Sequence, residues 1–286
     1  MIQEGVTSIG DYAFFDCSNL TDITIPESVT SIEECAFQNC SSLTDITIPG
    51  SVTSIGEGAF QGCSSLTSIE IPSSVTSIGD SAFSWCKNLT SINIPKGVTS
   101  IGDSAFSGTL WLTNKRQEND SLVIVNGILI DGTACSGEVT IPDGVASIGG
   151  SAFFGCSNMT SINIPKSVTS IENSAFYNCT GLTSIEIPDS VTSIGIGAFQ
   201  NCTGLTSVEI PEGVTSIGNY AFMSCDGLTS ITIPKSVTSI GGNVFNHCSS
   251  LKEVLLEGGS TLTSENFGEV ANKVVTRWNE GDLTWT

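Results

Sequence analysis

The spacing of proline is the sequence feature that most constrains the fold of this chain. The nine prolines lie 23 residues apart, except for one interval of 47, which is two periods plus one residue. They are Pro26, Pro49, Pro72, Pro95, Pro142, Pro165, Pro188, Pro211 and Pro234. The chain is therefore an array of repeats, and a unit of this length cannot bury its own apolar side alone.

The repeat reads L-x-x-I-x-I-P-x-x-V-T-S-I-G-x-x-A-F-x-x-C-x-x. Its alternating isoleucines predict a short strand with one inward face, and the proline ends the hydrogen-bonding run of that strand. V-T-S-I supplies a second inward pair, and A-F-x-x-C-x-x-L predicts an apolar turn that closes the coil. Because stacked coils bury one another, we predict an α/β-type solenoid of about twelve coils with a parallel β-sheet on one face.

The unit resembles the leucine-rich repeat of the BspA-like class, whose rungs read IPxxVTSIGxxAFxxCxxL, from residue 2 to about residue 256. It also resembles the general leucine-rich pattern, with isoleucine in place of most leucines. The resemblance implies a leucine-rich solenoid within a larger secreted or surface-attached protein of host-associated bacteria or parasitic protists. It further implies a role in adhesion and protein binding.

We expect one solenoid over residues 1–286. Residues 2–106 form the first repeat block, 107–138 an irregular insertion, 139–256 the second block and 257–286 a diverged C-terminal cap. Two readings of the cap stay open. A helix-like apolar stripe would include Val270, Ala271, Val274, Val275 and Trp278; the alternative is a closing strand over 276–285.

The insertion carries a strong turn signal. Two apolar runs flank Asn126 and Gly127, a pair that suits the type I′ turn, so we predict a β-hairpin there. The polar stretch 114–120 before it contains Lys115 and Arg116, the one adjacent basic pair in the chain. It is either a projecting loop that meets a partner or a tolerated insertion that leaves the coils stacked.

Nine of the eleven cysteines follow the repeat, three positions after a phenylalanine that recurs in phase. They are Cys17, Cys40, Cys63, Cys86, Cys156, Cys179, Cys202, Cys225 and Cys248. This phase faces inward, where a free cysteine behaves as a small apolar residue, so we expect the column to pack, Cys17 included. Stacking keeps the β-carbons about 4.8 Å apart, which disfavours disulfides along the column. Cys35, off the column, is expected to be partly exposed.

Charge and residue types argue against several functions. There are 29 acidic and 9 basic residues, and a net charge of -20 repels phosphate backbones and anionic lipid. No apolar run reaches the roughly 20 residues of a membrane span. With one histidine, His247, and no C-x-x-C pair, we expect no metal, cofactor or catalytic residue, and therefore no enzyme. We expect a monomer that binds neither nucleic acid nor membrane.

The outward positions supply the candidate protein-binding residues. Exposed aromatic side chains anchor interfaces, and acidic side chains alternate with the inward isoleucines. The candidates are Trp85, Trp111, Phe154, Tyr177, Lys115, Arg116, Glu70, Glu186 and Glu209. We predict binding to another protein, such as a host matrix or surface protein, outside the cell or at its surface. A structural spacer is the alternative reading, and a carbohydrate-binding module is the third.

Overall fold

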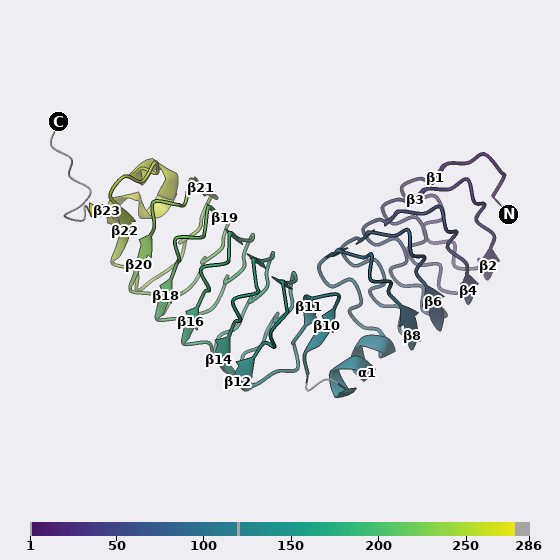
Figure 1. The fold of residues 1–286 in the computed structure, drawn as a ribbon, viewed down its shortest axis with the longest axis horizontal. Helices are drawn as coiled ribbons and strands as arrows, with labels where there is room; N and C mark the ends of the chain where they lie inside the picture. The colour runs from purple at the N-terminus through teal and green to yellow at the C-terminus, as the bar shows by residue number, and fades with distance from the viewer. Residues whose placement is uncertain (1, 119–120, 278–286) are drawn as a thin grey trace. The chain divides into compact units, whose positions relative to one another are not determined.

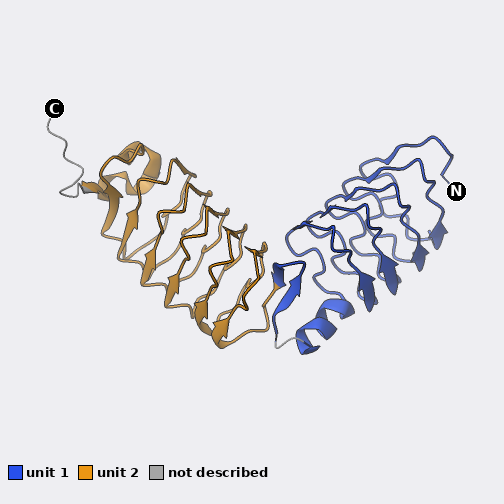
Figure 2. Ribbon diagram, viewed as in Figure 1, with its two compact units in different colours: residues 1–130 blue, residues 131–286 orange. Residues whose placement is uncertain are grey.

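The computed structural model describes residues 2–118 and 121–277. The chain divides into two compact units, unit 1 over Met1–Ile130 and unit 2 over Asp131–Thr286 (Figure 2). The division lies within the irregular stretch 107–138. Each unit is a stack of coils that contain short parallel strands, as Figure 1 shows, and the chain has about twelve turns. This architecture confirms the predicted parallel solenoid.

Two rows of strands run along unit 1. The V-T-S-I segments form a five-stranded parallel sheet in the order β1, β3, β5, β7, β9, and each step advances 23 residues, as from Ser8 to Ser31. The L-x-x-I-x-I segments form a second row, in which β2 pairs with β4 and β6 with β8. The bounds are β1 (Ser8–Ile9), β2 (Asp22–Ile23), β3 (Ser31–Ile32), β4 (Asp45–Ile46), β5 (Ser54–Ile55), β6 (Ser68–Glu70), β7 (Ser77–Ile78), β8 (Ser91–Asn93) and β9 (Ser100–Ile101).

A helix occupies most of the polar stretch 114–120, for which the sequence left a projecting loop and a tolerated insertion as alternatives. Helix α1 spans Leu110–Glu118. Thr109 caps it: its hydroxyl accepts a hydrogen bond from the Leu112 amide at 3.1 Å and donates one to the Phe106 carbonyl at 2.8 Å. Trp111 and Leu112 are buried, which holds the helix against the core of unit 1. The projecting-loop alternative was wrong for residues 114–118, because the Thr109 cap and the two apolar anchors hold this stretch in a helix.

The predicted hairpin is present, with β10 (Val123–Val125) and β11 (Ile128–Asp131) as its strands. Asn126 and Gly127 join them with φ of 52° and 80°, the left-handed conformations of a type I′ turn. The Asn126 side-chain amide also donates to the Pro95 and Val98 carbonyls, at 2.9 and 2.8 Å. These bonds hold the turn against the last regular coil of unit 1.

Unit 2 repeats the two rows. The V-T-S-I strands β13, β15, β17, β19 and β21 are parallel neighbours in that order. In the other row β12 pairs with β14, β16 with β18, and β20 with β22. Strand β22 also pairs with β23 (Val274–Arg277) on its other side. The bounds are β12 (Gly137–Thr140), β13 (Ser147–Ile148), β14 (Met159–Asn163), β15 (Ser170–Ile171), β16 (Ser184–Glu186), β17 (Ser193–Ile194), β18 (Ser207–Glu209), β19 (Ser216–Ile217), β20 (Ser230–Ile233), β21 (Ser239–Ile240) and β22 (Glu253–Glu257).

The chain after β22 forms a short helix and then a strand. The 3-10 helix η1 spans Ser264–Lys273, and β23 (Val274–Arg277) pairs in parallel with β22. Val270 is buried in η1, as the helical stripe predicted, but Val274 and Val275 belong to the strand, so the stripe was wrong there. Trp278 and most of the alternative strand over 276–285 lie outside the described residues.

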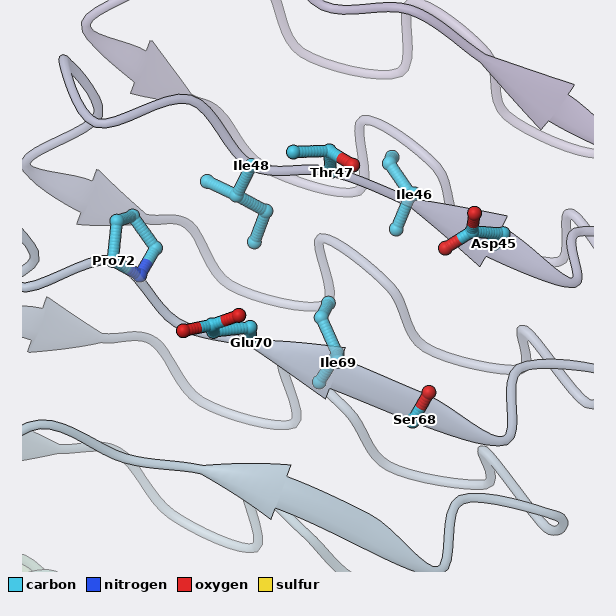
Figure 3. A pocket seen from close by; sticks show the side chains of 8 residues that line it. All are labelled: Asp45, Ile46, Thr47, Ile48, Ser68, Ile69, Glu70 and Pro72. Atoms are coloured by element: carbon cyan, nitrogen blue, oxygen red, sulfur yellow. The ribbon is translucent and has the colours of Figure 1, made fainter.

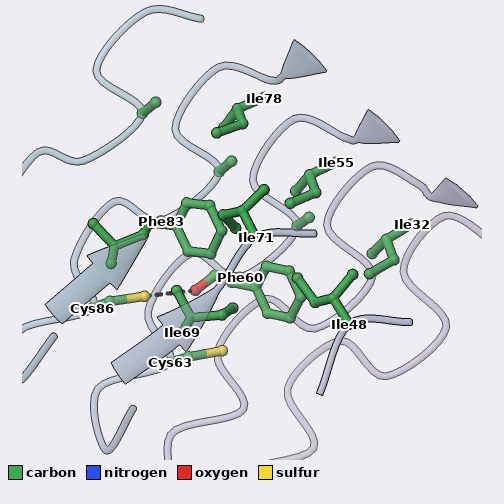
Figure 4. Packing of buried hydrophobic residues seen from close by; sticks show 14 of the residues in the cluster. Ile32, Ile48, Ile55, Phe60, Cys63, Ile69, Ile71, Ile78, Phe83 and Cys86 are labelled. Atoms are coloured by element: carbon green, nitrogen blue, oxygen red, sulfur yellow. Dashed lines mark hydrogen bonds between the residues drawn. The ribbon is translucent and has the colours of Figure 1, made fainter. Parts of the chain in front are cut away.

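The core of each unit is a set of columns, one residue from each coil. Phenylalanine rings of successive coils stack nearly parallel, with centroids 5.4 Å apart for Phe37 and Phe60 and 5.1 Å for Phe176 and Phe199. Isoleucines from both strand rows pack around them (Figure 4). Successive coils therefore bury equivalent apolar side chains against one another.

The cysteine column is held by hydrogen bonds as well as by packing. The Cys86 thiol donates to the Phe60 carbonyl of the preceding coil at 3.0 Å (Figure 4). Cys202 does the same with Phe176 at 3.1 Å. No disulfide links the cysteines of the column.

Cys17 is the exception, because it is exposed. Our prediction that it packs was wrong, since the first described coil has a neighbouring coil on one side only.

Candidate functional site

The turns that contain A-F-x-x-C form one side of each solenoid, which we call the turn face. Its outward positions are the two residues before the A-F pair and the two residues after it. Two positions in every turn adopt left-handed backbone conformations, one two residues before the ladder phenylalanine and one two residues after it. In the second position these residues are Asp16, Asn39, Gly62, Trp85, Gly108, Gly155, Asn178, Asn201, Ser224 and His247.

Exposed aromatic side chains gather on the turn face. Trp85 is 56% exposed, Phe154 51% and Tyr12 50%, and Phe15 and Tyr220 are also exposed. Three of them, Trp85, Tyr12 and Tyr220, occupy left-handed positions, with φ of 61°, 56° and 60°. A side chain with a β-carbon is disfavoured in that conformation, and bulky residues there are uncommon.

Local contacts orient these aromatic rings. The Phe154 and Tyr177 rings stack with centroids 4.9 Å apart, which leaves Tyr177 half-buried. The Trp85 ring lies close to Gly108, and the Lys87 ammonium is 5.9 Å from its centroid. The Tyr12 hydroxyl donates to a Glu34 carboxylate oxygen at 2.5 Å, and this hydrogen bond raises the pKa of Tyr12 to about 12. The rings are therefore held in place rather than free in solvent.

The turn faces of the two units differ in charge. In unit 1 the position three residues before the ladder phenylalanine is acidic in every regular coil: Asp11, Glu34, Glu57, Asp80 and Asp103. In unit 2 the same position holds Gly150, Asn173, Ile196, Asn219 and Gly242. Side-chain oxygens in this column accept backbone hydrogen bonds from the next coil in both units, as Asp11 does from Glu34 and Asn173 from Ile196. This hydrogen bond occurs in both units, but the accepting side chain is negatively charged only in unit 1.

The insertion residues divide into buried and accessible ones. Trp111 is 7% exposed and packs on Phe106, with ring centroids 4.9 Å apart, so it is not available to a partner. Its proposed binding role is withdrawn, because the indole closes the end of the core of unit 1. Lys115 forms an ion pair with Glu118 at 2.7 Å, and Arg116 is half-buried on the same helix.

The acidic candidates lie on the row of L-x-x-I-x-I strands, which we call the strand face. Glu70, Glu186 and Glu209 are all exposed there. Glu186 and Glu209 are direct neighbours in the parallel register of β16 and β18. Glu70 lies beside Asn93 in the register of β6 and β8. The structure thus brings two of the three carboxylates together and keeps the third in the other unit.

Each unit has a hollow on the strand face, beside one of these glutamates. In unit 1 a hollow of about 410 Å³ lies between β4 and β6 and their proline turns, with Glu70 on one side (Figure 3). In unit 2 a hollow of about 420 Å³ lies between the ends of β14 and β16, with Glu186 on one side. The repeat spacing did not reveal the hollows, because their lining combines side chains of neighbouring coils.

The thiols and carboxylates form no further chemical constellation. Burial raises the pKa of the partly exposed Cys35 thiol, and Glu34 adds to this effect. Among residues 2–118 and 121–277, no group of three His, Cys, Asp or Glu side chains is placed to hold a metal ion. No helix within the same residues is long and apolar enough to cross a membrane.

Several bacterial proteins of known structure are similar to this chain. A leucine-rich repeat protein from Bacteroides ovatus is 26% identical over 98% of this chain and 83% of its own, with a TM-score of 0.43. A leucine rich cell surface protein from Faecalibacterium prausnitzii is 28% identical over 98% and 87%, with a TM-score of 0.46. The pneumococcal vaccine antigen PcpA is 19% identical over 95% and 83%; its TM-score of 0.52 marks a likeness of fold. No curated protein matches the chain.

The family of the chain follows from its repeats. Six copies of the BspA type leucine rich repeat region match residues 1–121 and 132–252. The unmatched stretch between them contains the hairpin of β10 and β11. This chain therefore belongs to the BspA type leucine rich repeat family.

Proposed function

We propose that this chain is a non-catalytic protein-binding or adhesion module of a bacterial cell-surface or secreted protein, and that it binds its partner through the turn face. The family to which it belongs supports the adhesive role and the surface location. The acidic charge supports a protein partner rather than a nucleic acid, because phosphate backbones would be repelled. The module acts as a monomer.

One observation carries the choice of the turn face. Trp85 occupies a left-handed position that holds glycine or asparagine in six other coils, and it is more than half exposed. A non-glycine residue there costs roughly 1 kcal/mol, and an exposed indole recovers little of it by burial. Strained and exposed aromatic residues favour a binding role, because their side chains become buried only in a complex.

The other faces of the coils favour the alternative, a structural spacer. Threonine hydroxyls on both strand rows donate to the carbonyl of the equivalent residue in the preceding coil, as Thr53 does to Thr30 at 3.3 Å and Thr206 to Thr183 at 3.1 Å. Serine hydroxyls form a third ladder, as from Ser167 to Val145 at 2.7 Å. These groups serve the stacking of the coils, and a chain with only such faces would hold other domains apart.

The experiment replaces the aromatic residues with residues that the repeat already uses at the same positions. The variant combines Tyr12→Ser, Phe15→Gln, Trp85→Asn, Phe154→Gln and Tyr220→Ser, because Ser, Gln and Asn occupy these positions in other coils. Binding of the whole chain to immobilised matrix and serum proteins is measured by surface plasmon resonance. We expect saturable binding by the unmodified chain and an affinity at least tenfold lower for the variant. A tenfold loss of affinity corresponds to about 1.4 kcal/mol of binding free energy, which truncation of interface anchors commonly exceeds.

Two controls separate the possible surfaces. A variant with Thr24→Asn, Thr140→Asn and Thr232→Asn alters the exposed strand face by using the asparagine that Asn93 and Asn163 provide there. A variant with Lys115→Gln and Arg116→Gln tests α1. Full binding by the turn-face variant would contradict the proposed surface, and loss of binding in one of the controls would show which other surface is used. Failure of the unmodified chain to bind any protein in the panel would favour the spacer.

A further inference from the structure

The two hollows on the strand face share one position in the repeat. In both, the last two residues before one proline lie beside the glutamate and the proline of the next coil: Thr47 and Ile48 beside Glu70 and Pro72, and Asn163 and Ile164 beside Glu186 and Pro188. In both, the strands concerned are not joined as a ladder: β2 pairs with β4 and β6 with β8, but β4 does not pair with β6, and β14 does not pair with β16. Both hollows therefore lie beside strands between which the row of ladders is interrupted.

The floor of each hollow is apolar and its rim is acidic. In unit 1 the lining combines Ile46, Ile48, Ile69 and Pro72 with the carboxylates and hydroxyls of Asp45, Thr47, Ser68 and Glu70. Figure 3 shows the Asp45 and Glu70 carboxylates on opposite strands of the hollow. In unit 2 the floor holds Ile164, Ile187 and two prolines, and the rim holds Asp143, Glu186, Asp189, Asn163 and Lys166. Carboxylates exceed cationic groups in both hollows.

The chain offsets little of the charge of these rims, since Lys166 is the one cationic residue among their lining residues. Among the described residues, no ion pair joins Asp45, Glu70 or Glu186 to a lysine or arginine. Glu186 also has Glu209 directly beside it on the next strand, and like charges in this relation are unfavourable. A cation bound at the rim would reduce that repulsion as well as gain its own attraction to the carboxylates.

Lysine and arginine side chains fit this arrangement. They carry a cationic head on a flexible apolar stem, so the stem can cover isoleucine and proline while the head meets carboxylates at the edge. We infer that each hollow is a subsite for an alkylammonium or guanidinium group on an apolar stem, supplied by a basic segment of a partner protein. Glu70 and Glu186 are the carboxylates that recognise it. This inference goes beyond the turn face and does not depend on it.

The test uses the whole chain and a defined probe. A fluorescent 12-residue peptide of alternating Lys and Ser is titrated at low salt, and fluorescence anisotropy gives its Kd. Glu70→Gln and Glu186→Gln should each weaken binding about threefold, as expected for partly exposed charge pairs, and the double variant by about tenfold. The matched control combines Glu57→Gln and Glu172→Gln, which removes the same charge at exposed positions outside both hollows. It should change Kd less than twofold.

Further arms decide what binds. A peptide of alternating Gln and Ser should not bind, and free spermidine should compete only weakly if the source is a protein segment. Competition by spermidine as strong as by the peptide, lost in the double variant, would support the cationic chemistry and identify a polyamine as its source. Equal loss in the double variant and the matched control would overturn the inference, because net charge alone would then explain binding. Absence of peptide binding would overturn it too. Neither result concerns the aromatic residues, so the proposed function fails or stands separately.

Discussion

The Cys63 thiol donates a hydrogen bond to the backbone carbonyl of Phe37, 3.2 Å away in the preceding coil. The same relationship joins Cys179 to Phe153 at 3.1 Å. The Phe37 carbonyl also accepts the Cys40 amide of its own coil at 3.1 Å, so the thiol of the next coil adds a second hydrogen bond to the same oxygen. A column of alanine or valine would fill space but would lose this second hydrogen bond, while the carbonyl would keep its bond from the amide of its own coil.

Replacing Cys63 tests whether the thiol acts as a donor. Cys63→Ala removes buried volume and the hydrogen bond, and should lower the free energy of unfolding by about 1–3 kcal/mol. Cys63→Ser keeps a donor at the same place and should lower it no more than alanine does. A plain apolar role would instead make serine clearly worse, because its hydroxyl would then be buried without a partner. Urea unfolding measures each value, and Cys17→Ala at the exposed position is the control, with a change below about 0.5 kcal/mol.

Alkaline pH should destabilise the stacked coils through the buried thiols. Burial raises the pKa of Cys40 and of Cys248 from 9.0 to about 11. The folded chain then holds these protons more tightly than the unfolded chain, so their contribution is complete below pH 9 and is lost as pH rises towards 11. The melting temperature should fall over this range, and less steeply in a variant with Cys40→Ser and Cys248→Ser. Identical pH curves for that variant and the unmodified chain would contradict the thiol origin of the effect.

The phenylalanine ladder should be most sensitive to substitution in its interior. Phe60 stacks on Phe37 and on Phe83, with centroids 5.4 and 5.3 Å away, and is fully buried. Phe60→Ala should cost about 3–5 kcal/mol of unfolding free energy. Phe14 has a ring neighbour in one coil only and is half-buried, so Phe14→Ala should cost clearly less. Chemical unfolding midpoints of the two variants compare them, and equal losses would argue against the ladder as a cooperative stack.

The Asn126 side chain should stabilise the chain beyond its role in the turn. Asn126→Gly preserves the left-handed conformation but removes two hydrogen bonds to Pro95 and Val98. We expect a loss of about 1–3 kcal/mol, since each bond contributes roughly 0.5–1.5 kcal/mol. Asn126→Ala should lose about 1 kcal/mol more, because alanine is strained at positive φ. Thermal unfolding measures both, and a glycine variant as stable as the unmodified chain would show that the two bonds contribute nothing.

Trp85 should reduce the stability of the folded chain. Trp85→Asn and Trp85→Ala remove the same indole, but asparagine tolerates the left-handed conformation better than alanine. The asparagine variant should therefore be more stable than the alanine variant by up to about 1 kcal/mol, and should match or exceed the unmodified chain. Denaturant unfolding at one temperature provides the comparison. An unmodified chain clearly more stable than both variants would mean that the indole is kept for packing.

Much of the fold could be predicted from the repeat. Once Pro49 and Pro72 set the period, the inward phase of the isoleucine, phenylalanine and cysteine columns followed from strand alternation, and the family followed from the same motif. The hairpin at Asn126 and Gly127 could also be predicted, because the turn type depends on two adjacent residues. These predictions hold because they use short-range geometry that each coil reproduces.

The candidate site was harder to predict from the sequence. Trp85, Phe154 and the strand-face glutamates lie at outward positions of the repeat and are exposed. The sequence did not distinguish Trp111 from them, because its burial depends on the capped helix that brings it onto Phe106. The hollows beside Glu70 and Glu186 are formed by side chains from neighbouring coils that come together only in the folded stack. No local pattern reports either property.

The sequence by itself determined the period, the columns and the side of the coil on which each residue lies, because these depend on backbone alternation and on steric limits within one repeat. Only the tertiary structure decided which members of a column are buried. Cys17 and Cys63 share one position in the motif, yet Cys17 is exposed and Cys63 is fully buried. The physical reason is that neighbouring coils cover Cys63 on both sides, whereas the coil that contains Cys17 has a described neighbour on one side only.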